Sequence, residues 1–131
     1  MFILDTNSLI YFFKGMGNVA ARLLATSPTE IAIPSVVLFE LEYGLAKSSS
    51  PRKRRAQLEE ICSLVELLPF GNEEAKFAAR VRAQLDKKGT PIGTCDLLIA
   101  ATALARSGIL VTNNIREFSR VSNLEVDNWF D

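Results

Sequence analysis

Short apolar runs alternate with longer stretches of helical spacing along the chain. The apolar runs predict strands at residues 2–4, 30–34, 65–70 and 108–112, with a shorter strand near 124–126. The stretches between them predict helices at residues 6–14, 19–25, 36–47, 52–64, 73–88 and 95–107, with Ser35 and Thr94 as caps and Thr6 or Asn7 capping the first. Strands that alternate with helices are typical of a parallel sheet covered on both faces. The expected fold class is therefore α/β, a three-layer α/β/α sandwich with a small, mainly parallel sheet.

The composition indicates a single domain and excludes several types of catalytic site. The chain has 131 residues, of which 48% are hydrophobic, so we expect a single domain over residues 1–131. Fifteen basic residues balance fifteen acidic ones, so no overall positive field attracts nucleic acid. There is no histidine. Histidine-dependent acid–base and nucleophile schemes and imidazole zinc sites are therefore excluded.

The cysteines and the apolar runs carry no sign of a metal thiolate site or a membrane segment. Cys62 and Cys95 are too far apart to match a metal-ligand spacing, and each lies in an apolar helical stretch. No apolar run approaches the roughly 18 residues that a membrane span requires. We therefore expect a cytoplasmic protein with no membrane contact.

Several acidic residues lie beside or within apolar segments, where an ionised side chain is unfavourable unless a cation or hydrogen-bond donors bind it. Asp5 directly follows the first predicted strand, where it either caps the next helix or binds a cation, and the residue alone favours neither. Glu40 and Glu42 interrupt an otherwise apolar helix, and their spacing leaves open which of them is solvated. Asp96 begins the most apolar helix, where an acid also complements the helix dipole.

A last polar group, Thr112, Asn113, Asn114 and Glu117, follows the strand at residues 108–112. If the sheet brings this group together with the earlier acids, their mutual repulsion makes the site unfavourable without a cation. Carboxylate oxygens suit Mg²⁺ or Mn²⁺, which can lower the pKa of bound water and hold a phosphodiester. This chemistry needs no histidine.

Four motifs that carry these residues resemble the PIN-domain nucleases, and within them the VapC toxins of bacterial toxin–antitoxin pairs. They are "LDTN", "FELEYG", "GTPIGTCDLLIAATALA" and "LVTNNIREFSRV" with a later "NW", in the order and spacing of the family. The resemblance covers essentially the whole chain. Any one of these motifs is weak on its own, whereas four in register are specific.

The resemblance assigns roles residue by residue. It implies that Asp5, Glu40 and Asp96 are catalytic residues and metal ligands, with Glu40 chosen over Glu42. The family commonly has a fourth acid after the last core strand, but this chain has Asn114 there, so either Asn114 or Glu117 would complete the catalytic set. The hydroxyls of Thr6 and Thr112 match the supporting hydroxyls of the family.

The activity implied by the resemblance is that of a metal-dependent endoribonuclease, the toxin of a toxin–antitoxin pair. It would hydrolyse RNA, with tRNA as one candidate, through water activated by Mg²⁺ or Mn²⁺, leaving a 5′-phosphate and a 3′-hydroxyl. Family members form homodimers and are neutralised by a cognate VapB-like antitoxin. An alternative hypothesis is a catalytically weakened relative that binds RNA or an antitoxin.

Two further groups of residues are candidates for binding surfaces. Basic side chains near the acids or in a basic run are candidates for RNA phosphates, namely Arg116, Arg120, Arg52 and Arg54. The run from Leu9 to Phe13 has more apolar bulk than a short helix needs for one buried face. Tyr11 and Phe12 are therefore the predicted antitoxin contacts.

Overall fold

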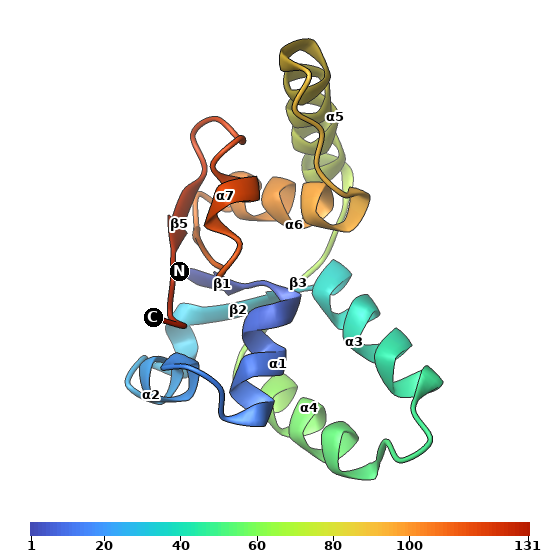
Figure 1. Ribbon diagram of the computed structural model, residues 1–131, viewed down its shortest axis with the longest axis vertical. Helices are drawn as coiled ribbons and strands as arrows, with labels where there is room; N and C mark the ends of the chain where they lie inside the picture. The colour runs from blue at the N-terminus through green and yellow to red at the C-terminus, as the bar shows by residue number, and fades with distance from the viewer.

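A five-stranded sheet forms the centre of the computed structural model, which describes residues 1–131 (Figure 1). The strands are β1 (Phe2–Leu4), β2 (Ile31–Pro34), β3 (Glu66–Leu68), β4 (Ile109–Val111) and β5 (Glu125–Asp127). Their order is β3-β2-β1-β4-β5, and every neighbouring pair is parallel. The mainly parallel sheet predicted from the sequence is confirmed.

Helices cover both faces of this sheet. They are α1 (Thr6–Lys14), α2 (Val19–Leu24), α3 (Ser35–Lys47), α4 (Arg52–Leu64), α5 (Asn72–Lys88), α6 (Thr94–Ala105) and α7 (Ile115–Phe118), with a 3-10 turn at Pro28–Glu30. In Figure 1, α1, α2 and α4 lie on one side of the strands, and α5, α6 and α7 lie on the other. This is the expected α/β/α sandwich. No helix has both the length and the apolar character needed to cross a membrane.

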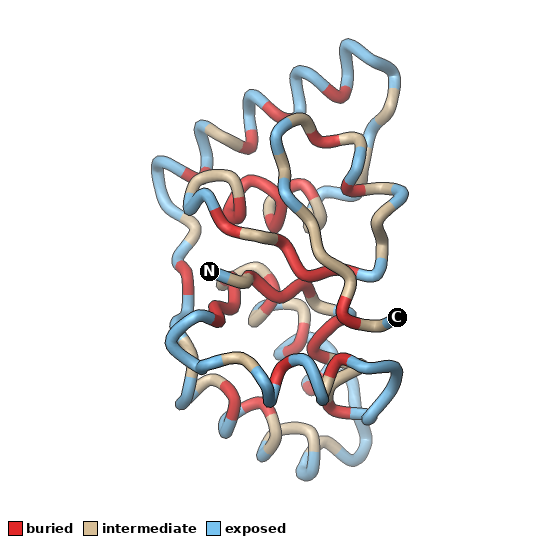
Figure 2. Tube along the Cα trace, turned by 90° about the vertical axis from the view of Figure 1, so that its left-hand side faces the viewer, coloured by how far each residue is buried: buried red, intermediate tan, exposed pale blue.

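The sheet is buried because helices exclude water from both of its faces. Ile3 and Leu4 of β1 are fully buried, as are their counterparts in the neighbouring strands, and Figure 2 shows the buried residues gathered in the middle of the trace. Gly108 allows β4 to approach β1, since a Cβ there would lie 2.5 Å from the Cδ1 atom of Ile3. Because β1 lies between β2 and β4 and runs parallel to both, its carboxyl end lies between the carboxyl ends of those two strands.

The ends of the helices differ in detail from the sequence prediction. Asp5, and not Thr6 or Asn7, caps α1, because its carboxylate accepts a hydrogen bond from the Ser8 N–H. Thr94 is the first residue of α6 and follows Gly93, which occupies the cap position. The short helix α7 was not predicted, since four residues are too few to show a helical period.

Candidate active site

Asp5 is a buried acid at the end of the central strand. Its side chain is 5% exposed, and its Oδ1 atom accepts a hydrogen bond of 2.8 Å from the backbone N–H of Ser8. Burial raises the pKa of Asp5 above its ordinary value of 3.8, hydrogen bonding from Thr112 and Ser8 opposes that rise, and the negative charge of Glu40 adds to it. Asp5 therefore caps α1, and its carboxylate is close enough to that of Glu40 for the two negative charges to interact.

The two glutamates of α3 have different surroundings. Glu42 accepts two hydrogen bonds from Arg55 of α4, with distances of 3.2 and 3.1 Å, and forms a salt bridge at the surface. Glu40 instead accepts a hydrogen bond of 2.5 Å from the Thr6 hydroxyl at the start of α1. No basic side chain pairs with Glu40. The alternative that the helix pattern left open is thus resolved in geometry, with Glu40 on the side of Asp5.

Asp96 lies in the first turn of α6, where the helix dipole normally favours a carboxylate. Here the pKa of Asp96 is nevertheless raised from 3.8 to about 6. Burial contributes most to that rise, followed by the negative charges of Glu117, Glu40 and Asp5. Asp96 is therefore the acid on which the charges of the other three converge.

The loop between β4 and α7 supplies the remaining polar groups. The Thr112 hydroxyl accepts a hydrogen bond of 3.0 Å from the backbone N–H of Asn114, and the Asn114 side-chain amide donates one of 2.6 Å to Glu117. Glu117 acts electrostatically on Asp96, which lies on another helix. Asn114 and Glu117, the two candidates for the fourth catalytic position, are therefore hydrogen-bonded to each other.

We call the four carboxylates of Asp5, Glu40, Asp96 and Glu117 the acidic edge. They come from the end of β1 and from α3, α6 and α7, and no salt bridge neutralises any of them. As the side chains stand, no group of three or more Asp, Glu, Cys or His residues is arranged to hold a metal ion. The set nevertheless consists of oxygen donors that repel one another, and this fits Mg²⁺ or Mn²⁺ in chemistry. Binding would require their side chains to rotate.

The basic residues predicted to bind RNA are not equally available. Arg116 is exposed and lies one residue before Glu117, and Arg52 is also exposed. Arg120 donates a hydrogen bond of 3.0 Å to the Pro91 carbonyl, which ties it to the loop before α6. Arg54 donates to Gln57 and packs over the ring of Phe13, 5.0 Å from its centroid. Arg54 is therefore the one most committed to packing within the protein.

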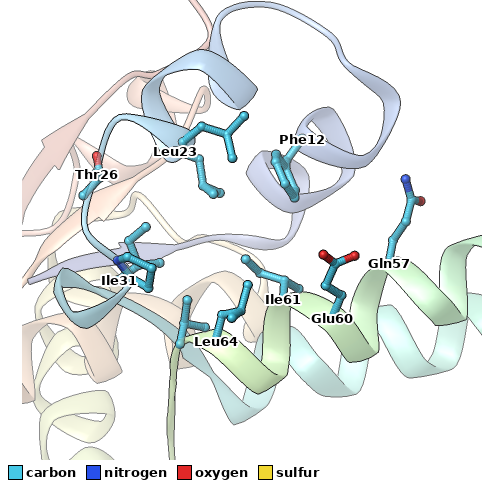
Figure 3. A pocket seen from close by; sticks show the side chains of 11 residues that line it. Phe12, Leu23, Thr26, Ile31, Gln57, Glu60, Ile61 and Leu64 are labelled. Atoms are coloured by element: carbon cyan, nitrogen blue, oxygen red, sulfur yellow. The ribbon is translucent and has the colours of Figure 1, made fainter.

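An apolar groove lies away from the acidic edge, between α1, α2 and α4 (Figure 3). Its volume is about 280 Å³, and seven of its eleven lining residues are hydrophobic. The predicted antitoxin contact Phe12 points into the groove in Figure 3, together with Leu23 and Ile61. Tyr11, the other predicted contact, does not line it, because its ring packs edge-on against Phe130 with centroids 4.8 Å apart.

Some neighbours of the acidic edge were missed in the sequence. Ser8 is buried, and its hydroxyl donates a hydrogen bond of 3.0 Å to the Val111 carbonyl, joining α1 to β4. Its position three residues after an acid is the usual N-cap spacing and could have indicated it. Cys95 lies beside Glu40 and Asp96, and burial followed by the Glu40 charge raises the pKa of its thiol. Nothing in its apolar helical context indicated that position.

Comparisons with known proteins agree on one family. The PIN domain family model matches residues 2–124. The tRNA(fMet)-specific endonuclease VapC of Salmonella typhimurium is 35% identical, over 98% of this chain and 97% of its own length. Ribonuclease VapC2 of Rickettsia felis is 39% identical, over 98% of each chain. Among solved structures, VapBC2 from Rickettsia felis bound to a promoter DNA fragment superposes with a TM-score of 0.91 at 37% identity, covering 98% of both chains.

Proposed function

The chain belongs to the PIN-domain family, and from that premise we propose that it is a metal-dependent endoribonuclease and the toxin of a toxin–antitoxin pair. The observation that carries this proposal is the acidic edge, four carboxylates on four elements whose charges meet at Asp96 with no cation among the protein's own side chains. Relatives that are named as ribonucleases support RNA as the substrate class.

Asp5, Glu40, Asp96 and Glu117 would hold Mg²⁺ or Mn²⁺, and Asp96 is the residue that all the others affect. When bound, such an ion lowers the pKa of a water and stabilises negative charge on a phosphodiester. The protein orients its own carboxylates for this task. The Thr6 hydroxyl holds Glu40, the Ser8 N–H holds Asp5, and the Asn114 amide holds Glu117. Arg116, exposed next to Glu117, is positioned to bind an RNA phosphate.

The test is cleavage of RNA, with a tRNA pool among the substrates, by the purified protein. We expect cleavage with Mg²⁺ or Mn²⁺ that stops on addition of EDTA, and products with 5′-phosphate ends that RNA ligase accepts. Asp96→Asn should lower the rate by about 100-fold or more, because it removes a ligand charge while keeping the shape of the side chain. A wild-type protein that binds RNA without cutting any of it would instead favour a catalytically weakened binding module.

We further propose that the apolar groove holds an apolar segment of a VapB-like antitoxin. Leu64 on its rim is 57% exposed and Leu24 is 77% exposed, so the apolar lining of the groove continues onto the open surface as a patch that a partner could cover. Two solved relatives that superpose on this chain, from Rickettsia felis and Salmonella typhimurium, are VapBC complexes. The experiment titrates RNA cleavage with a purified VapB-like antitoxin.

For that titration, Leu64→Asp should weaken neutralisation by about tenfold or more, since it places a charge against an apolar partner. Leu67→Asp is the matched control, because Leu67 is an exposed leucine of β3 that does not line the groove. Equal neutralisation of both variants would place the antitoxin elsewhere.

The homodimer implied by the family resemblance remains a prediction. Phe39 and Tyr43 of α3 are 60% and 56% exposed, with their rings stacked 6.4 Å apart, and they are a suitable contact for a second copy. Sedimentation of the wild type and of Tyr43→Lys measures this. Dimers that persist unchanged in the variant would exclude this face.

A further inference from the structure

Asn114, in the loop after β4, lies three residues before Glu117, the fourth carboxylate of the acidic edge. Asn114 is the cap residue of α7, yet its side chain makes no hydrogen bond to the backbone of that helix. A capping asparagine normally accepts such a bond through its carbonyl oxygen. Here the side-chain amide donates to the Oε2 atom of Glu117 over 2.6 Å instead. The side chain of Asn114 is thus committed to the acid three residues later.

We propose that Asn114 is a positioning residue that fixes Glu117 as the fourth carboxylate of the acidic edge, an inference that rests on the proposed metal-dependent function. An amide N–H holds one carboxylate oxygen without neutralising its charge, so the attraction for a cation is kept. A lysine or arginine at this position would neutralise that charge, and an aspartate would repel it. The second oxygen of Glu117 takes no part in the bond to Asn114.

The other end of Asn114 is anchored as well. Its backbone N–H donates a hydrogen bond of 3.0 Å to the Thr112 hydroxyl, at the end of β4. Asn114 therefore lies between a strand end and Glu117, with one bond to each. Both Asn114 and Glu117 are half-buried, which protects the bond between them from competition by water. Asn114 therefore contributes to the geometry of the site, and its presence in place of an acid does not indicate a catalytically weakened protein.

An exchange of the two groups tests this inference. Asn114→Asp, Glu117→Gln and the double variant are compared with the wild type in Mn²⁺ titration calorimetry and in thermal unfolding without metal. Glu117→Gln should weaken Mn²⁺ binding by about 10- to 100-fold. Asn114→Asp should lower the melting temperature of the metal-free protein, because two carboxylates then face each other.

In the double variant the amide and the carboxylate exchange places along one hydrogen bond, so the total charge of the acidic edge and position 114 together equals that of the wild type. We expect its Mn²⁺ affinity to return to within about threefold of the wild type, and its metal-free melting temperature to recover. Losses that merely add in the double variant would overturn the inference.

A neutral comparison removes the donor alone. Asn114→Ala should weaken Mn²⁺ binding by about tenfold, whereas Asn113→Ala should not, since Asn113 is exposed and bonds only to Asn128. Equal affinities for the two alanine variants would also overturn the inference. A wild type that binds no Mn²⁺ contradicts the proposed function itself. A wild type that binds Mn²⁺ and cuts RNA, with no recovery in the double variant, contradicts only the role of Asn114.

Discussion

The two sides of α3 treat the same residue type in opposite ways. On the side of α4, Glu42 is matched by the guanidinium of Arg55 with two hydrogen bonds. On the side of α1 and α6, Glu40 accepts a hydrogen bond from the Thr6 hydroxyl and lies beside the Cys95 thiol, with no salt bridge, and its charge adds to those of Asp5 and Asp96. The two glutamates are separated by a single leucine in the sequence, so composition and helix propensity do not distinguish them.

The contrast between Glu40 and Glu42 shows how a reactive site can be located in a protein of balanced charge. A surface ion pair such as Glu42–Arg55 contributes little to stability and requires nothing further. A group of carboxylates without a cation is unfavourable in the folded state, and folding tolerates it only where other interactions compensate. The carboxylates left without a partner, and not the total number of charges, indicate the site.

The largest difference between Glu40 and Glu42 is expected when each glutamate is neutralised in turn. Glu40→Gln should lower RNA cleavage by about 100-fold or more, because it removes a proposed metal ligand. Glu42→Gln should leave the rate within about twofold of the wild type, because its carboxylate serves only a surface ion pair. Initial rates on one fluorescent RNA at saturating Mg²⁺ measure both. Comparable losses in the two variants would contradict the assignment of Glu40.

Metal-induced stabilisation sharpens the same contrast without any substrate. At a Mn²⁺ concentration about 100 times its Kd, the wild type should gain about 2.7 kcal/mol of unfolding free energy by mass action. Glu42→Gln should keep this gain, and Asp96→Asn should lose most of it. Thermal unfolding at about pH 7.5 with and without Mn²⁺ gives the values. Equal gains in the wild type and Asp96→Asn would mean that the acidic edge is not the metal site.

The pH dependence of the metal-free protein provides a smaller effect with a defined sign. Because the pKa of Asp96 is about 6 in the folded protein and 3.8 in the unfolded chain, the folded state binds a proton between these pH values that the unfolded chain has released. Stability should therefore rise as the pH falls from about 7.5 to about 5, by about 1 kcal/mol after allowance for the partial exposure of the carboxyl group.

Urea unfolding at several pH values across this range measures the rise, and Asp96→Asn is the comparison. The variant should be the more stable protein at the alkaline end without metal, with a flatter profile. Asp5 has a raised pKa as well, so part of the rise should persist in the variant. A steeper profile in Asp96→Asn than in the wild type would mean that the raised pKa was assigned to the wrong residue.

The smallest effect on stability is expected from removal of the Glu42–Arg55 ion pair between α3 and α4. Arg55→Gln should lower the melting temperature by no more than about 2 °C, because both partners of its ion pair are largely exposed. The same variant should leave Mn²⁺ affinity unchanged. A tenfold change in that affinity would show that the two sides of α3 are coupled.

The sequence predicted the strands and the acids but not their contacts. Apolar runs such as residues 2–4 and 108–112 have a clear pattern, so β1 and β4 could be located from that pattern alone. The choice between Glu40 and Glu42 depends on which neighbouring helix packs on each side of α3, and no local pattern contains that information. Thr6, which bonds Glu40, is 34 residues away from it.

Side-chain direction was harder still to predict. Tyr11 and Phe12 are adjacent aromatic residues of α1, and only the second faces the groove, since consecutive helical residues point about 100° apart. Arg54 looked like a free cation in a basic run, yet it packs over Phe13 from another helix. Such pairings arise from tertiary packing between helices, which a single sequence does not encode locally.

The order of the strands has a consequence for a ribosome that makes this protein. β1 and Asp5 are synthesised before β4, with which β1 pairs, and Glu117 lies beyond β4 in the chain. A nascent polypeptide therefore lacks one side of its central strand and part of its acidic edge until β4 and α7 have been added. The machinery that cells use for translation is rich in RNA, and a chain built in this order has no complete acidic edge there until Glu117 has been added.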